Sequence, residues 1–195
     1  MINLANKIVE VFENKLLPMT QKSVGKGNKI FGAAILNKEN LSLIVAGTNN
    51  ELENPLWHGE VNTLKKFYEL PIEKRPLEKN CIFITSHEPC SLCLSAITFS
   101  GFDNFYYLYP YETTLKDFNI PHDLKILKEV FGIENGNYNK SNTYWSCVSI
   151  IDLIKNTSGG EKVELNKALD RIKDSYKKLS EQYQSNKQKN KIPLK

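Results

Sequence analysis

The chain has 195 residues, of which 41% are hydrophobic and 25% charged, and its formal net charge is +4. This length suits one domain, or one domain with an appendage, and the composition is ordinary for a globular protein. No apolar run approaches the length of a membrane span, and Met1–Leu4 lack the basic-then-apolar pattern of a secretory signal. We therefore expect a cytoplasmic protein without a membrane partner, whose four cysteines stay reduced.

The positive charge is concentrated at the C-terminal end. Residues 161–195 carry ten Lys or Arg against five Asp or Glu, whereas the first 160 residues carry sixteen against seventeen. A dedicated nucleic-acid enzyme is expected to have a basic surface around its site, which the first 160 residues do not indicate. The basic tail keeps RNA as a second candidate partner.

Apolar periodicity predicts alternating helices and strands over residues 1–155. The helices are expected at residues 3–17, from about 58 to 70, 89–101 and 121–131; the strands are expected at residues 30–36, 41–46, 81–85, 104–109 and 143–150. Pro18 is expected to end the first helix. The order predicts an α/β fold: a three-layer α/β/α sandwich with a five-stranded mixed sheet.

A different kind of segment follows Gly159-Gly160. Residues 156–183 are predicted to form a linker and a C-terminal amphipathic helix, with apolar residues at spacings of four and three from Leu165 to Tyr183. This seam predicts either a helix that docks on its own domain or a dimer contact, and its short length favours docking. Residues 184–195 are polar and basic and are expected to be a disordered tail.

Two short motifs carry the chemistry. They are His58-x-Glu60 and Pro89-Cys90-x-x-Cys93. A structural zinc takes four protein ligands, whereas a catalytic zinc keeps one position open, so one imidazole and two thiols indicate a catalytic site. The pattern is the mark of zinc deaminases, in which the glutamate stays off the metal as general acid and base. We therefore predict Zn²⁺ held by His58, Cys90 and Cys93, with Glu60 as the catalytic residue.

The spacing of these residues also predicts where they lie. Cysteines at i and i+3 share one face of a helix, and a helix N-terminus favours the thiolate that a metal needs. His58 and Glu60 are two residues apart, so both can reach one metal only at the N-terminal end of their helix. Two helix ends are therefore expected to converge at the carboxyl edge of the sheet, where ligands bind in open α/β sheets.

Each motif taken alone has other interpretations. Cys-x-x-Cys is also found in redox dithiols and closed zinc knots, although Cys81 and Cys147, in mid-strand, are poorly placed to complete a knot. Both are expected to be buried, inert thiols. A single histidine such as His58 is more often a surface or core residue than a ligand, and His87 and His122 are interpreted as surface or loop hydrogen-bonding residues.

Residues 30–131 resemble the cytidine deaminase-like superfamily. The segments Phe31–Ile35, Gly47-Thr48-Asn49, His58-Gly59-Glu60 and Glu88-Pro89-Cys90-x-x-Cys93 fall in that family's order. Glu88 before Pro89 resembles the branch of guanine, cytosine and tRNA adenosine deaminases, in which the last two strands run parallel. The resemblance implies that Asn49 binds the substrate and that homodimers form.

Two residues beside the motif have no settled role. Gly59 departs from the alanine usual in the family, which should loosen the helix start slightly and leave the ligands in place. Trp57 either stacks on a planar substrate ring or is a core aromatic residue at a helix start. No C-terminal motif selects a substrate.

The sequence therefore predicts a zinc-dependent hydrolytic deaminase of a nucleobase, nucleoside or nucleotide of salvage metabolism, with guanine or cytosine favoured. The first alternative is adenosine-to-inosine deamination in tRNA. The second is a non-catalytic, zinc-stabilised partner subunit that dimerises through its C-terminal helix. Retention of Glu60 counts against this second alternative, because a scaffold has no use for a carboxylate beside the metal.

Overall fold

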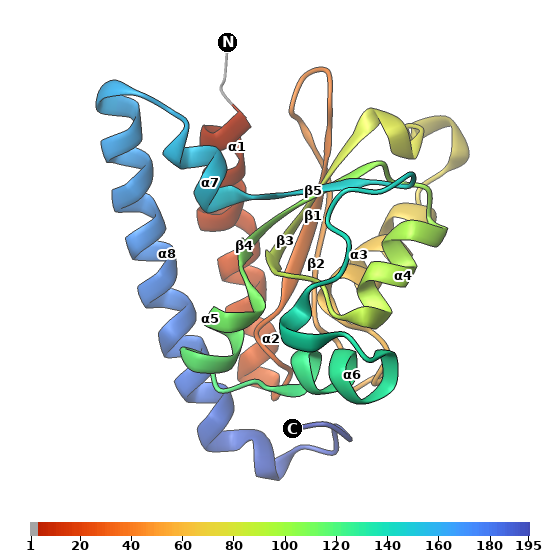
Figure 1. Ribbon diagram of the computed structural model, residues 1–195, viewed down its shortest axis with the longest axis vertical. Coiled ribbons are helices and arrows are strands. Elements are labelled where there is room, and N and C mark those ends of the chain that lie inside the picture. Colours follow the sequence, from red (N-terminus) through yellow and green to blue (C-terminus); the bar gives the residue numbers. More distant parts are fainter. Residues whose placement is uncertain (1–3) are drawn as a thin grey trace.

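The computed structural model describes residues 4–195 and places a sheet between two layers of helices (Figure 1). Within these residues the sheet has five strands in the order β2-β1-β3-β4-β5. The strands are β1 (Gly32–Asn37), β2 (Leu43–Thr48), β3 (Cys81–His87), β4 (Asn104–Tyr109) and β5 (Ser146–Ser149). The predicted mixed α/β sandwich is confirmed.

The sheet combines an antiparallel half with a parallel half. β1 pairs antiparallel with both β2 and β3, whereas β4 runs parallel to β3 and β5 runs parallel to β4. The parallel direction of the last two strands is as the family branch implies. Since β2 and β3 both lie antiparallel to β1, their carboxyl ends reach the same edge of the sheet.

Side-chain alternation along β1 divides the core into two parts. Ala34 and Leu36 pack into one buried cluster with the N- and C-terminal helices, whereas Ala33 and Ile35 pack into a second one. Successive strand residues point to opposite faces, so one short apolar strand serves both layers. The second cluster includes Leu64 and Ile97 from the helices that carry the motifs, on the right in Figure 1.

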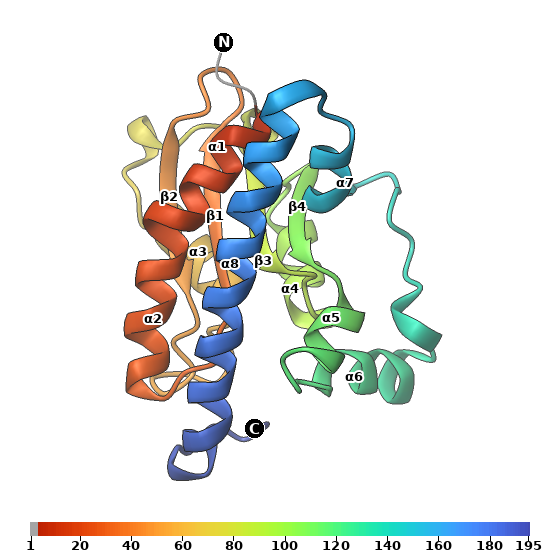
Figure 2. The same cartoon turned by 90° about the vertical axis from the view of Figure 1, so that its left-hand side faces the viewer.

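Four helices cover the first face, and Figure 2 shows the two N-terminal ones end to end beside the long C-terminal one. They are α1 (Leu4–Val11), α2 (Leu17–Lys26), α7 (Ile150–Lys155) and α8 (Gly159–Asn186). The second face is covered by α3 (Gly59–Tyr68) and α4 (Ser91–Phe99), while α5 (Tyr111–Lys116) and α6 (His122–Phe131) lie at the lower end of the molecule in Figure 1. Short single turns occupy Ile72–Lys74, Glu78–Asn80, Glu134–Gly136 and Lys187–Lys189.

The first helix does not end at Pro18, so this prediction is wrong. A π-helical turn, Phe12–Leu16, joins α1 to α2, and Pro18 stands in the first turn of α2. Proline is tolerated there because a first-turn N–H has no partner within its own helix. The helix continues to Lys26 and ends at Gly27, whose φ of 110° is left-handed. The predicted start at residue 3 lies outside the described residues.

Helix α8 docks on its own domain. Leu165, Ile172 and Tyr176 are buried in the same cluster as Ile84 of β3, which agrees with the docking interpretation. The division into a deaminase domain at residues 1–155 and a linker with a C-terminal helix at residues 156–183 stays a prediction. No helix among residues 4–195 is long and apolar enough to cross a membrane.

The segment 184–195 follows a folded course instead of the disordered one expected. α8 runs to Asn186, a single turn spans Lys187–Lys189, and only 2% of Ile192 is exposed. The physical reason is the apolar triplet Ile192-Pro193-Leu194, which can pack although the residues around it are basic. This segment returns the chain to the carboxyl edge of the sheet.

Candidate metal centre and active site

Two helices begin at this edge with their N-termini converging. β2 leads through a loop into α3, which His58 precedes, and β3 leads into α4, which Cys90 precedes. Both preceding residues have extended backbones, with ψ of 162° and 170°. An extended residue at each helix start turns its side chain toward the end of the helix, so the two motifs meet there.

Three ligand atoms come together between the helix ends. His58 Nδ1 lies 3.4 Å from Cys90 Sγ and 3.8 Å from Cys93 Sγ, and the two sulfurs are 3.5 Å apart. Zinc bonds of about 2.0–2.3 Å in a tetrahedron would separate such atoms by roughly 3.5–3.8 Å. Among the described residues these three are the group of His, Cys, Asp or Glu side chains that can hold a metal ion. The donor set fits zinc, and it leaves one position of a tetrahedron open.

Glu60 lies beside this group and is 4% exposed. Its Oε2 is 3.3 Å from Cys93 Sγ. Burial, together with the negative charge of Cys90, raises the pKa of Glu60 to about 7. A small cavity of about 10 Å³, close to the size of one water molecule, is bordered by Glu60, His58 and both cysteines.

In the metal-free site the two thiols and the imidazole shift one another's pKa values. The hydrogen bond from Cys93, with a further contribution from His58, holds the pKa of Cys90 well below its usual range. Burial and the neighbouring Cys90 raise the pKa of Cys93. Burial lowers the pKa of His58, but the hydrogen bond to Cys90 and the charges of Cys90 and Glu51 outweigh it and raise this pKa to about 9. The site thus favours a thiolate before any metal arrives.

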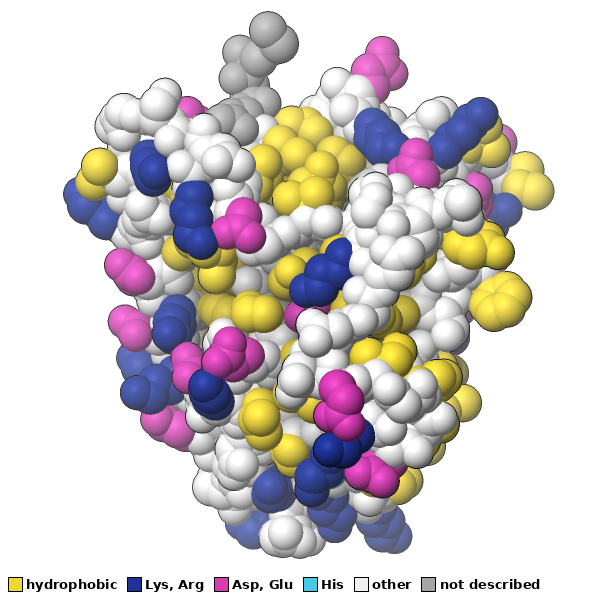
Figure 3. Space-filling view, in the orientation of Figure 1, with side chains coloured by type: hydrophobic (Ala, Val, Ile, Leu, Met, Phe, Trp, Pro, Cys, Tyr) yellow, Lys and Arg dark blue, Asp and Glu magenta, His cyan; other side chains and the backbone are white. Residues whose placement is uncertain are grey.

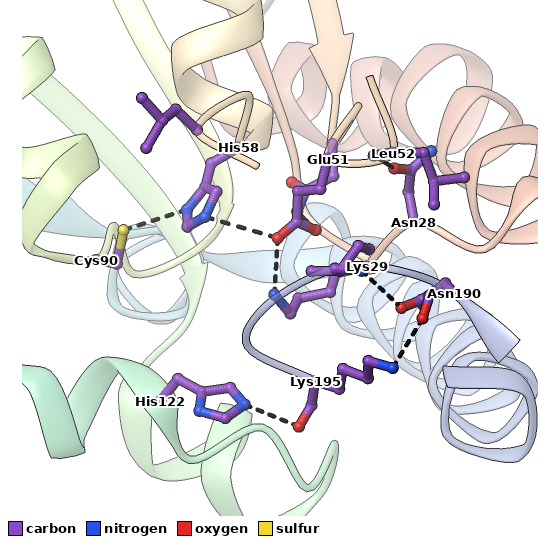
Figure 4. A network of polar contacts seen from close by, with 12 residues as sticks. Asn28, Lys29, Glu51, Leu52, His58, Cys90, His122, Asn190 and Lys195 are labelled. Atoms are coloured by element: carbon purple, nitrogen blue, oxygen red, sulfur yellow. Dashed lines mark hydrogen bonds and ion pairs between the residues drawn. The ribbon is translucent and has the colours of Figure 1, made fainter. Parts of the chain in front are cut away.

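A buried ion pair supports the histidine from its other side (Figure 4). Lys29 Nζ lies 2.7 Å from Glu51 Oε1, and both side chains are at most 5% exposed. The same oxygen is 3.7 Å from His58 Nε2. Because Nδ1 faces the thiols, Nε2 must carry the proton when the ring ligates a metal, and a carboxylate there stabilises that tautomer.

Asn49, the predicted substrate contact, lies next to this network with its amide engaged. Its Oδ1 accepts a hydrogen bond from the Gly59 N–H at 2.6 Å, and its Nδ2 donates to Glu51 Oε2 at 2.7 Å. The first bond satisfies a free N–H at the start of α3, and the second holds the carboxylate that faces His58. A substrate-binding role for Asn49 stays a prediction.

Trp57 lies away from the ligand group. Lys65 Nζ lies 4.9 Å from the centre of its ring, and within the described chain Trp57 borders neither the small cavity nor the larger one beside it. Its neighbour Leu56 lines the larger cavity instead.

The larger cavity, of about 350 Å³, opens outward from the ligand group. It shares Phe31, His58, Cys90 and Asp123 with the small cavity. Asp123, in the first turn of α6, is the one Asp that lines both cavities. Burial and the negative charge of Cys90 raise the pKa of Asp123 well above its usual range. The rest of the lining is mostly apolar, from Leu56, Ile120, Ile126, Ile192, Pro193 and Leu194.

Sequence reasoning predicted the three side chains that come together and Glu60 beside them, but missed Lys29, Glu51 and Asp123. Their spacing gives no signal, because Lys29 precedes β1 and Asp123 opens α6, far apart in the chain. The Ile192-Pro193-Leu194 triplet was a usable signal, since it is the apolar part of a basic tail.

His87 is also different from expected. It is 2% exposed, its Nδ1 lies 2.8 Å from Ser86 Oγ, and four aromatic rings surround it. It is therefore a core histidine rather than a surface residue. Cys81 is buried and Cys147 is half-buried, and both are free thiols.

These features define a class: an α/β domain with three side chains that fit zinc and a buried carboxylate where two helix ends meet. The family described as cytidine and deoxycytidylate deaminase zinc-binding region matches residues 7–109. The chain belongs to this family, and the resemblance seen in the sequence is confirmed.

Solved structures share the fold at low identity. A guanine deaminase from Nitrosomonas europaea is 15% identical, with a TM-score of 0.52 over 89% of this chain and 86% of that one. A guanine deaminase from Bacillus subtilis is 21% identical, with a TM-score of 0.52 over 87% of this chain and 95% of that one. A comparison with curated proteins gives no match.

Proposed function

We propose that the chain is a zinc-dependent hydrolytic deaminase that replaces the exocyclic amine of a nucleobase by a carbonyl oxygen and releases ammonia. The observation that carries this proposal is the three-ligand group with Glu60 3.3 Å from one of its sulfurs. In the reaction a C–O bond to water forms and the C–N bond to the amine breaks. The proton lost by the water must therefore reach the departing amine.

His58, Cys90 and Cys93 would hold the zinc, which when bound lowers the pKa of a water molecule and so supplies the nucleophile. Glu60 acts as general base toward that water and then as general acid toward the ring nitrogen and the amine. Burial keeps competing water away from its carboxylate. Two thiolates cancel the charge of a divalent ion, which suits a neutral heterocycle.

The larger cavity supports a free base as the substrate, with guanine or cytosine favoured. Its volume of about 350 Å³ is at the small end of ligand sites, and its lining is mostly apolar. Asp123 offers a carboxyl group to an N–H of a bound ring. Asn49 is proposed as a further contact, for which its amide must release Gly59 or Glu51.

Adenosine deamination in tRNA is the second candidate, and one observation favours it. Lys and Arg side chains gather at the lower end of the molecule in Figure 3, the end where the chain terminates in Figure 1. Lysines 187, 189, 191 and 195 belong to this segment. RNA held by these lysines would bind with a steep salt dependence, so equal RNA affinity at low and high salt would exclude this function.

The experiment that tests the proposal is an ammonia-release screen of the zinc-loaded protein against bases, nucleosides, nucleotides and a tRNA anticodon stem. Release from guanine or cytosine, lost on removal of zinc, is the expected result. A zinc-loaded protein that deaminates nothing in the screen would instead fit a non-catalytic partner subunit. Homodimer formation is proposed from the family resemblance and is tested by sedimentation.

A further inference from the structure

Three of the last six residues border the larger cavity. They are Ile192, Pro193 and Leu194, and they share the lining of this cavity with His58 and Cys90. These residues follow α8, which packs on the other side of the sheet, so the chain passes around the edge of the domain to reach the site. Figure 4 shows this segment looping in front of Lys29 and toward His122.

Hydrogen bonds at both ends fix the course of the segment. Asn190 Nδ2 donates to the Gly27 carbonyl at 2.8 Å, which ties its start to the end of α2. His122 Nε2 lies 3.0 Å from the Lys195 carbonyl oxygen, which ties its end to α6. Lys195 Nζ also donates back to the Asn190 carbonyl at 2.7 Å, which closes the loop on itself.

Between these ties the segment presents apolar groups to the cavity. Ile192 is buried, whereas Leu194 is 50% exposed at the mouth. Leu56, which is 58% exposed, and Leu92, which is 37% exposed, line the same cavity. Exposed leucines that share one cavity indicate a surface that a ligand covers.

We propose that residues 190–195 form the outer wall of the base pocket and restrict it to a free aminoheterocycle, excluding substrates that carry ribose. The inference rests on the proposed function. It adds the element of the fold that selects a free base over a nucleoside.

The physical argument concerns the hydroxyl groups of a sugar. If the amine-bearing carbon lies at the ligand group, the rest of the ring extends into the cavity that Ile192, Pro193 and Leu194 help to line. A ribose there would lose water from its hydroxyls against side chains that have no hydrogen-bonding group. Apolar walls discriminate against an added hydroxyl by up to about 100-fold, so we expect the base to exceed its nucleoside in kcat/KM by about that factor.

The test compares three zinc-loaded proteins: the full chain, a chain that ends after Lys189, and Leu194→Ala. Removal of the wall should raise KM for the base about tenfold with kcat nearly unchanged, because apolar contact is lost away from the reacting atoms. The preference for base over nucleoside should fall in the same protein. Leu194→Ala should show a smaller shift in the same direction.

The matched control is Leu77→Ala, because Leu77 is 59% exposed and lies before β3, outside the lining of this cavity. Its kinetics should equal those of the full chain. A readout independent of activity is the reaction of the metal-free protein with an aromatic disulfide reagent. Cys90 lines the cavity, so it should react several times faster once the wall is removed, while the buried Cys81 should not.

Two results would overturn the proposal. One is an unchanged KM and an unchanged Cys90 reaction rate in the shortened chain, which would mean that the segment forms no wall. The other is a full chain that deaminates nucleosides as well as bases. If no amine is released from any compound, the proposed function fails, and the thiol reaction then decides on the wall by itself.

Discussion

Replacing Glu51 by glutamine should weaken zinc binding without touching a ligand. The carboxylate lies 3.7 Å from His58 Nε2 and is held in place by Lys29 and Asn49. Loss of a carboxylate partner of a metal-bound histidine costs about 10–100-fold in metal affinity. We therefore expect the zinc dissociation constant of Glu51→Gln to rise by this factor, measured by competition with a chromophoric chelator.

The same substitution has a second effect, which must be separated from the first. It leaves the buried Lys29 ammonium without its partner, and breaking a buried ion pair costs about 3–5 kcal/mol of stability. The double variant Lys29→Met, Glu51→Gln removes the unpaired charge. It should recover most of the free energy of unfolding, measured by denaturant titration, and still bind zinc about 10–100-fold more weakly.

The double variant therefore tests the reasoning. Wild-type zinc affinity in the double variant would show that Glu51 acts only by neutralising Lys29. The positioning role would then be wrong.

Three further predictions concern single residues. Burial lowers the pKa of His87 to about 3, so the unfolded chain takes up a proton below about pH 6.5 and the folded one does not until about pH 3. The free energy of unfolding therefore falls as pH falls through this window, by about 2 kcal/mol at pH 5. His87→Phe should abolish that loss in denaturant titrations of metal-free protein. An equal loss in the variant would show that another group causes the pH dependence. A Cβ on Gly59 would lie 2.8 Å from Gly32 Cα, so Gly59→Ala should lower the melting temperature at a cost of about 1–3 kcal/mol, whereas the control Gly25→Ala meets nothing and should be neutral or stabilising. Cys93→Ser should bind no stoichiometric zinc by metal analysis, and retention of one zinc per chain would remove Cys93 from the ligand set.

The order of elements and the clustering of His58, Cys90 and Cys93 could be predicted because each depends mainly on residues close together in sequence. The spacing Cys90-x-x-Cys93 places both thiols on one helix face whatever the rest of the chain does. His58-x-Glu60 likewise needs only a helix that begins there. Local pattern therefore predicted the ligand set that the structure brings together.

What could not be predicted depends on contacts between distant segments. Lys29 and Glu51 form a pair only because the chain before β1 and the loop after β2 reach the same sheet edge. Gly59 reads from sequence as a slightly loosened helix start. In the fold it is the position where α3 approaches the backbone of Phe31 and Gly32 too closely for any side chain.

The course of residues 184–195 could not be predicted from their amino-acid composition. Residues 184–195 are polar and basic enough to predict disorder, yet three apolar residues find a surface at the cavity. A segment this short cannot fold alone, so its course is decided by the surface it meets. Sequence pattern carries no information about that surface.

The measurement that tests the central claim most directly is zinc content and ammonia release in the wild-type protein and in Glu60→Gln. The substitution keeps the size of the side chain and removes its ability to accept a proton, and general acid–base groups contribute about 10²–10⁴-fold to rate. We predict one zinc per chain in both proteins and a loss of turnover of at least about 100-fold in the variant. Full turnover by a zinc-loaded Glu60→Gln protein would contradict the account.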